Sequence, residues 1–449
     1  MYLDFYQFNK APFLVAPDPE FLFLSPSHQA ALGAIAYGIG SRQGFVMLVG
    51  EVGVGKTTIL RSYLERVDPQ LKIIFVLHGH LTFVDILKTI SRACGLQEDT
   101  NDTSAWLDSG FYAHPDLTQP KDRIVAYHNI FDPTAKSDAL QTGEVASWHG
   151  MMTSVVAAGN GHLSEGFYRG IAPDSKLVLV KIGRSGRIPD QDIERGLQWI
   201  LDHREEHNIR IVNISAGGDF EQAYFRSSLC KTVERAVSEG LVVVCAVGNA
   251  GMAPGHPVLP PASSPSAISV GGLDDQNSLD RARRGMYRSS YGPTIDGLQK
   301  PEVIAPGIWV AAPILPHTPT ADEAKLYSAL DDAADDQLLE IIEAHPRIDK
   351  DLYESRELPI ALLRQLITIK LHEGNVINQH YKYVDGTSFS SPIVASIVAC
   401  MLEANPGLTP QKVKRILIKT AERVSGIEVD RQGWGVVVPA RAVAAALDP

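Results

Sequence analysis

The sequence predicts an α/β protein: a mainly parallel sheet flanked by helices, preceded by a partial β-α-β-α unit and carrying a helical insert. Three observations predict this class. A strand, a glycine-rich turn and a helix pattern follow one another at 46–60, short apolar runs alternate with helical segments from residue 99 onward, and purely helical patterns interrupt them at 319–374. Because 449 residues exceed what one hydrophobic core organises, we expect two units, 1–98 and 99–449.

Composition describes a globular chain and excludes some partners. Hydrophobic residues make up 45%, and the net charge of −11 includes no basic block, so we expect neither nucleic acid nor an anionic membrane as partner. The four cysteines, Cys94, Cys230, Cys245 and Cys400, are too scattered for a metal site or a disulfide framework. No window reaches the ~18 apolar residues of a membrane span, and MYLDFYQFNKAPF lacks the basic region and apolar stretch of a signal peptide. We expect a cytoplasmic protein.

The first unit contains a phosphate-binding loop. Residues 50–57 match G-x-x-x-x-G-K-[ST] between a strand and a helix pattern. Glycines let backbone N–H groups turn toward phosphate oxygens, Lys56 would neutralise the outer phosphates, and Thr57 would hold magnesium. ATP with magnesium is therefore the expected ligand. The predicted nucleotide-binding residues are Gly50, Gly53, Gly55, Lys56 and Thr57.

A strand pattern at 72–77 and a helix pattern at 82–94 continue this unit. Through PFLVAPDPEFLFLSPSHQAAL and the loop, residues 1–97 resemble the start of the AAA-type ATPases of bacterial general secretion. Such ATPases continue with a strand that ends in an acidic pair, but the nearest run here, 123–131, leads to His128 and Asn129. Without that carboxylate phosphoryl transfer lacks a central part, so a structural relic or a regulatory nucleotide binder is favoured over an ATPase.

Three motifs of the second unit carry an Asp, a His and a Ser in that order: WLDSG with Asp108, WHGMMTSVVAAG with His149, and DGTSFSSPIVAS with Ser388. A serine hydroxyl is a weak nucleophile unless an imidazole removes its proton and a carboxylate orients that imidazole. Asp108 ends an apolar strand pattern, whereas His149 and Ser388 each begin a helix pattern. Gly150 would keep the approach to His149 open, and the helix dipole would favour an anion beside Ser388.

A fourth motif, LVVVCAVGNAG, reads as a buried parallel strand that ends near Asn249, whose amide could donate to an oxyanion beside the Ser388 N–H. At these four motifs, residues 102–449 resemble the subtilisin-like serine peptidases, or subtilases. The resemblance implies a subtilisin-like fold and an extended peptide or protein substrate aligned by Ser215, Ala216 and Gly217. It also implies that catalysis needs no metal, although structural calcium is common in the family, at a site that the sequence does not locate.

The helical insert at 319–374 lies shortly before Ser388 in the chain. Thr320 and Glu323 have capping-box spacing at the start of its first helix pattern, and Gly374 ends its last one. Its apolar stripes contain Leu326, Leu330, Leu338, Ile341 and Ile342. A lid over the substrate, a surface for a partner and a solvated decoration all remain open as interpretations.

The sequence thus predicts a serine endopeptidase in which Asp108 orients His149, His149 activates Ser388, and Asn249 stabilises the oxyanion. The alternative from another class is a nucleotide-sensing interaction protein in which the phosphate loop is the working site and the protease fold is an inactive scaffold. A third interpretation joins the two, with nucleotide occupancy gating proteolysis.

Overall fold

The computed structural model describes residues 23–40, 48, 54–64, 102–184, 187–278 and 280–447. The chain divides into two compact units, Met1–Glu98 and Asp99–Pro449. The described helices of the first unit are α2 (Pro26–Gly40) and α3 (Lys56–Leu64). The strand expected at 72–77 and the helix expected at 82–94 lie outside the described residues.

The second unit is built on a mostly parallel sheet. Within the described residues the sheet has eight strands in the order β2-β3-β1-β4-β5-β6-β7, and β8 also pairs with β6. Every pairing is parallel except that of β6 with β7. The strands are β1 (Thr103–Asp108), β2 (Ile124–Asn129), β3 (Lys176–Lys181), β4 (Ile209–Ile214), β5 (Val242–Ala246), β6 (Ile268–Asp274), β7 (Gly285–Met286) and β8 (Val303–Pro306). The predicted fold class is confirmed.

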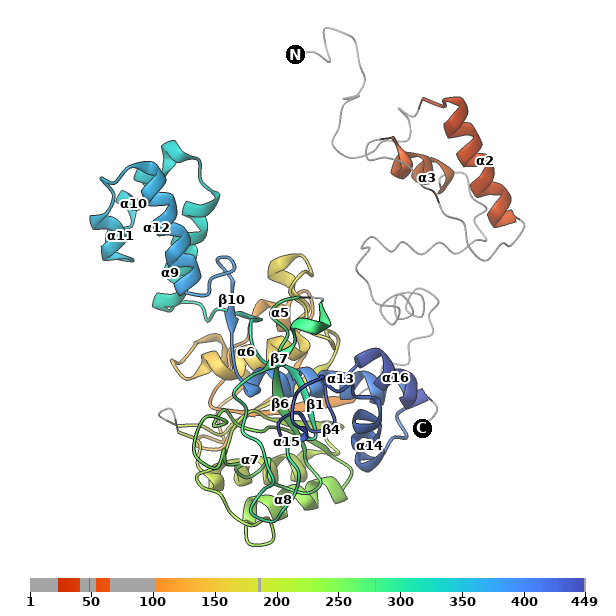
Figure 1. Cartoon of the computed structure of the whole chain (residues 1–449), viewed down its shortest axis with the longest axis vertical. Helices are drawn as coiled ribbons and strands as arrows, with labels where there is room; N and C mark the ends of the chain where they lie inside the picture. Colours follow the sequence, from red (N-terminus) through yellow and green to blue (C-terminus); the bar gives the residue numbers. More distant parts are fainter. Residues whose placement is uncertain are drawn as a thin grey trace. The chain divides into compact units, whose positions relative to one another are not determined.

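Helices cover both faces of the sheet, which explains why its strands are apolar throughout. Along β3, Leu177 and Leu179 join one core, and Val178 and Val180 join the other. The first core is closed by α6 (Ser147–Ala158), α13 (Thr387–Ala404), α14 (Pro410–Thr420) and α16 (Pro439–Leu447). The second core is closed by α7 (Asp190–His203) and α8 (Ser228–Ser238), and these two helices lie side by side in Figure 1. Two short helices, α5 (Pro115–Thr118) and α15 (Val429–Gln432), complete the unit.

The apolar run at 123–131 forms β2, at one edge of this sheet beside β3. It therefore belongs to the second unit and supplies no strand to the first. His128, at which we looked for an acidic residue, stacks on Trp199 of α7 with the ring centroids 4.5 Å apart. The side chain thus has a packing role.

Helix α13 is the most apolar long helix that the structure describes. By length and composition its 18 residues meet the minimum for crossing a membrane, which the sequence analysis did not expect. Most of the helix is buried against α6, α16 and strands β4, β5, β6 and β8. It is therefore the central core helix of the second unit.

The insert forms a helical cluster with a core of its own. A two-stranded antiparallel ribbon, β9 (Val310–Pro313) with β10 (Tyr381–Val384), joins it to the sheet. Between these strands lie α9 (Pro319–Asp332), α10 (Leu338–Ala344), α11 (Lys350–Glu354) and α12 (Ile360–Glu373), drawn in cyan to blue in Figure 1. The predicted apolar stripes pack together: Leu326, Leu330, Leu338 and Ile342 are buried, and Ile341 packs against them.

The start of the insert differs from the prediction. The N-cap of α9 is Thr318, whose side chain accepts a hydrogen bond from Ala321 N, and not Thr320. Pro319 occupies the first helical position, which its fixed φ and missing N–H favour, so the helix begins before the expected capping box. The predicted end at Gly374 is confirmed, since α12 ends at Glu373.

Candidate active site

Asp108 and His149 form a hydrogen-bonded pair at the carboxyl edge of the sheet. Asp108 is the last residue of β1 and is 1% exposed, and its Oδ1 lies 2.7 Å from His149 Nδ1. The same oxygen accepts from Ser109 N at 2.7 Å, and Oδ2 accepts from Thr153 Oγ1 at 3.2 Å. An ionised carboxylate can only accept, so His149 carries its proton on Nδ1 and leaves Nε2 free to act as a base.

The contact between α6 and β1 depends on Gly150. A Cβ at this position would lie 2.1 Å from the Gly110 carbonyl oxygen and 2.9 Å from the Asp108 Cβ. Only glycine therefore lets the first turn of α6 approach β1 closely enough for His149 to reach Asp108. The role of Gly150 that the structure shows is thus close packing of α6 on β1, whereas an open approach to His149 stays a prediction.

His149 experiences two opposing influences. Burial disfavours the imidazolium, but the charge of Asp108 and its hydrogen bond outweigh burial, and the pKa of His149 is raised above its usual 6.5. Trp148 meets the ring edge-on, with the centroids 5.2 Å apart, and Phe389 lies at 6.0 Å. The imidazole is thus fixed by a carboxylate on one side and by aromatic rings around it.

Ser388 lies in the first turn of α13, shortly after Gly386, whose φ of 141° suits glycine. Its hydroxyl donates to the Ser215 carbonyl at 3.4 Å. Phe389, the next residue, is the one that contacts the His149 ring, and α13 packs on α6. The structure therefore brings the three predicted residues to one end of the sheet, with the hydroxyl hydrogen-bonded to the Ser215 carbonyl.

Asn249 follows β5 and is oriented by Thr387. Its Oδ1 accepts from the Thr387 N–H and from the Thr387 hydroxyl, both at 3.0 Å. This orientation turns Nδ2 toward the start of α13, where a Cβ on Gly386 would lie 3.6 Å from it. The amide donor therefore lies beside the turn that leads into α13 and Ser388.

The predicted substrate-aligning segment follows β4. Ser215 is buried and its hydroxyl donates to the Ser388 carbonyl at 3.0 Å, which ties this segment to the nucleophile. Among the described residues, no group accepts from or donates to the backbone of Ala216 or Gly217. Such an open edge can pair with an extended peptide.

Sequence reasoning missed the side chains that hold this arrangement in place. Asn213 Nδ2 donates to Ser215 Oγ at 2.9 Å, and Ser391 Oγ donates to Asn213 Oδ1 at 2.9 Å. Ser109 and Thr153 orient Asp108. All four lie inside or beside the motifs already singled out, so a search for polar residues in those motifs could have found them.

The phosphate-loop residues are described only in part. Gly55 has a φ of 82°, and Lys56 and Thr57 begin α3, as expected for a turn that leads into a helix. Gly50 and Gly53 lie outside the described residues. His28 of α2, which the sequence analysis did not single out, places its Nε2 3.1 Å from the Val54 carbonyl and so links α2 to the loop.

Metal and thiol chemistry finds little support in the part of the chain that the structure describes. No group of three or more His, Cys, Asp or Glu side chains there could hold a metal ion, so structural calcium stays an expectation. Cys230, Cys245 and Cys400 are buried thiols outside any disulfide. Burial raises the pKa of Cys245, which acts as a small apolar side chain, as predicted.

These features define a class of α/β protein. At one end of a parallel sheet, residues at the ends of strands and the starts of helices supply an Asp–His pair, a serine and an amide donor. Residues 104–435 match the Subtilase family, and the chain belongs to this family. Residues 39–121 match the AAA domain. Both resemblances noted in the sequence are confirmed.

Two curated relatives match different parts of the chain. Serine protease AprX of Bacillus subtilis (strain 168) is 29% identical over 346 residues, covering 75% of this chain and 64% of AprX. General secretion pathway protein A of Aeromonas hydrophila is 39% identical over 90 residues, covering 20% of this chain and 16% of that protein. The chain thus spans less than two thirds of the length of each.

Solved structures share the fold. The CspB protease of Clostridium perfringens aligns with a TM-score of 0.55 and 16% identity, covering 78% of this chain and 93% of that chain. Fervidolysin from Fervidobacterium pennivorans aligns with a TM-score of 0.51 and 21% identity, covering 78% and 43%.

Proposed function

We propose that this chain is a serine endopeptidase that hydrolyses peptide bonds through an acyl-enzyme. The observation that carries the proposal is the Asp108–His149 hydrogen bond of 2.7 Å, close to the first turn of α13, which carries Ser388 and Phe389. A neutral imidazole with Nδ1–H held by a carboxylate is the arrangement that activates a hydroxyl. Membership of the subtilase family and the likeness to AprX support the same reaction.

In the proposed reaction the Ser388 hydroxyl gives up its hydrogen bond to the Ser215 carbonyl and donates to His149 Nε2 instead. His149 Nε2 then takes the hydroxyl proton as Ser388 Oγ attacks the peptide carbonyl. The imidazolium, stabilised by Asp108, then protonates the leaving amine as the carbon–nitrogen bond breaks. Water, deprotonated by His149, attacks the ester carbon, and Ser388 leaves with the proton. Asn249 Nδ2 and the Ser388 N–H bind the oxyanion in both steps.

The substrate we propose is an extended peptide or protein segment that adds as a strand to the open edge at Ala216 and Gly217. Backbone pairing of this kind aligns a chain without selecting side chains, so specificity must come from pockets beside it. Placement in the cytoplasm is proposed as well, and the buried thiols outside any disulfide are consistent with a reducing compartment.

The experiment is labelling of the purified chain with a fluorescent fluorophosphonate, which reacts only with an activated serine. We expect labelling that Ser388→Ala abolishes and that Ser390→Ala retains. Ser390 is a matched control, because it lies on the same helix but donates to the Pro306 carbonyl. An unlabelled wild-type protein that binds nucleotide would favour the inactive-scaffold alternative.

We propose in addition that the first unit binds a nucleotide at Gly50, Gly53, Gly55, Lys56 and Thr57. The AAA match and the left-handed Gly55 before α3 support this, and a bound magnesium nucleotide would supply charge for a regulatory contact. Titration of the full chain with Mg-ATP, compared with Lys56→Ala, tests binding. Peptide cleavage that is the same with and without ATP would exclude nucleotide gating.

A further inference from the structure

A cavity of 350 Å³ lies beside the Asp108–His149 pair, on the side of β1 away from Ser215. Asn129 and Lys181, the last residues of β2 and β3, are neighbours in the sheet register and form part of its wall. Ala146, whose carbonyl accepts from Ser109 Oγ at 3.0 Å, and Gly183 form the side toward Asp108. The cavity therefore borders the residue that follows the orienting carboxylate.

The sheet order places this cavity beside the proposed position of the substrate. Strand β1 lies between β3 and β4, so a peptide bound above the end of β1 has on either side the chain segment that follows β3 and the one that follows β4. One continuation is the open edge at Ala216 and Gly217. The other begins at Gly183, which lies so close to β1 that a Cβ there would be 2.5 Å from the Ser109 Cα. A side chain of that peptide can therefore enter the cavity.

Within the described residues, the ionic lining of the cavity leaves one positive charge without a carboxylate partner. Lys181 Nζ is paired with Glu144 Oε2 at 2.5 Å, so these two charges offset each other. The exposed Arg184 lines the same cavity and stacks its guanidinium over Phe131, 5.9 Å from the ring centroid. Among the described residues, no carboxylate lies within ion-pair distance of Arg184. The neighbouring Arg187 is paired with Asp219 at 3.1 Å.

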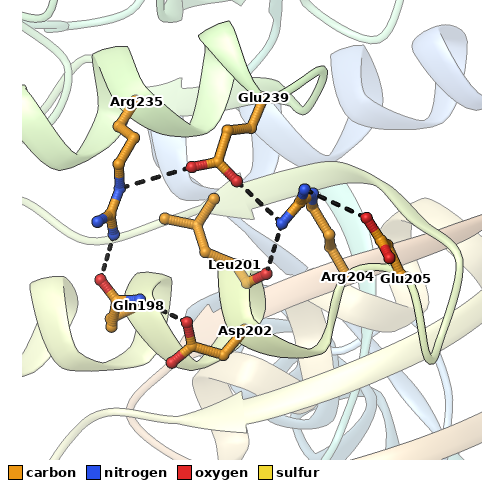
Figure 2. Close-up of a pocket in the computed structure, with 7 residues that line it drawn as sticks. All are labelled: Gln198, Leu201, Asp202, Arg204, Glu205, Arg235 and Glu239. Atoms are coloured by element: carbon orange, nitrogen blue, oxygen red, sulfur yellow. Dashed lines mark hydrogen bonds and ion pairs between the residues drawn. The ribbon is translucent and has the colours of Figure 1, made fainter.

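A second cavity, of 250 Å³, shows the contrasting case (Figure 2). Between the ends of α7 and α8, Arg204 pairs with Glu239 at 2.9 Å, and Arg235 contacts both Gln198 and Glu239. Asp202 accepts from Gln198 at 2.7 Å. Both arginines of that cavity therefore have a carboxylate partner, in contrast to Arg184.

We propose that the cavity beside Asp108 selects an acidic side chain of the substrate, close to the cleaved bond, with Arg184 as the residue that recognises it. A carboxylate entering there meets the guanidinium of Arg184, which can donate two parallel hydrogen bonds, whereas the ammonium of Lys181 is already paired with Glu144. The inference rests on the proposed peptidase function and adds a substrate class to it.

The test uses internally quenched peptides that differ only by Glu, Gln or Lys at successive positions around the cleaved bond. At one position we expect Glu to exceed Gln in kcat/KM by about fivefold, the upper range for a partly exposed ion pair, with the preference weakening in 1 M salt. Arg184→Gln should abolish the Glu-to-Gln ratio, and Arg184→Glu should shift preference toward Lys. The matched control Arg187→Gln should retain the wild-type ratio.

Two outcomes overturn the inference: a wild-type enzyme without a Glu preference at any position, or a preference that survives Arg184→Gln. Fluorophosphonate labelling of the same preparations separates the two proposals, since a labelled enzyme without charge preference refutes only the acidic pocket. If the wild type is not labelled, binding of Glu and Gln peptides to Ser388→Ala by fluorescence anisotropy still decides whether Arg184 recognises a carboxylate.

Discussion

Replacing Gly150 with alanine probes the geometry that carries the proposed chemistry. The added Cβ would lie 2.1 Å from the Gly110 carbonyl oxygen, so α6 and β1 must separate by roughly 1 Å to restore an ordinary contact. That shift acts directly on the 2.7 Å hydrogen bond between Asp108 and His149. Because a displacement of about 1 Å can cost about 10²-fold in rate, we expect acylation to slow by at least that factor.

The assay is the burst of p-nitrophenol from an activated ester, measured beside the thermal unfolding temperature. Gly196→Ala is the matched control, because Gly196 lies on α7, against the other face of the sheet, and its added Cβ would lie 2.4 Å from Ile182 Cγ2. Both variants should lose about 1–3 kcal/mol of stability through overpacking, but only Gly150→Ala should lose the burst rate. A folded Gly150→Ala protein that acylates as fast as the wild type would refute the reasoning.

Three further outcomes are expected. Because the pKa of His149 is raised and catalysis needs the neutral imidazole, kcat/KM should fall as the pH drops through a pKa above 6.5. The stability contributed by the ion pair of protonated His149 with Asp108 should be complete below pH 6.5 and lost as the pH rises through the same raised pKa. An activity pKa below 6.5 in a pH–rate profile would contradict this. Asn249→Ala should lower kcat by about 10²–10³-fold, the loss known for removal of the equivalent oxyanion donor in a subtilisin, and steady-state kinetics with unchanged kcat would remove the residue from the oxyanion site. Glu302→Ala removes the counter-charge of Lys300 and Lys414, whose Nζ atoms each lie 2.7 Å from Glu302 Oε1, so urea titration should show a free energy of unfolding lower by about 3–5 kcal/mol. Removal of the exposed Glu354 carboxylate should lower it by less than about 1 kcal/mol.

The fold was predictable because its signals are local. Apolar runs such as 241–247 have to be buried on both faces, which already implies a parallel sheet covered by helices. Asp108, His149 and Ser388 were found because each lies at the end or start of an element, close to a glycine whose role the structure explains. A glycine such as Gly150 lets a helix pack closely on a strand, and such contacts bring distant segments together into one site.

Other features escaped prediction because they depend on contacts between distant residues. Lys181 and Glu144 are 37 positions apart, and each reads alone as an ordinary surface charge. The start of α9 was misplaced because Thr320 and Glu323 imitate a capping box, whereas Pro319 lets Thr318 cap the helix. The hydrogen bond from the Ser388 hydroxyl to the Ser215 carbonyl depends on the side-chain rotamer of Ser388, which no sequence pattern predicts.

The burial of α13 has a consequence for the order in which the protein is made. Ser388 lies in the first turn of α13, which packs on β4, β5, β6 and β8, so it can be positioned only after those strands exist. Domains form as units while synthesis proceeds from the N-terminus, and at about 10 residues per second roughly half a minute separates Asp108 from Ser388. A nascent chain therefore carries Asp108 and His149 long before Ser388, so a chain released early would lack the serine on which the proposed reaction depends.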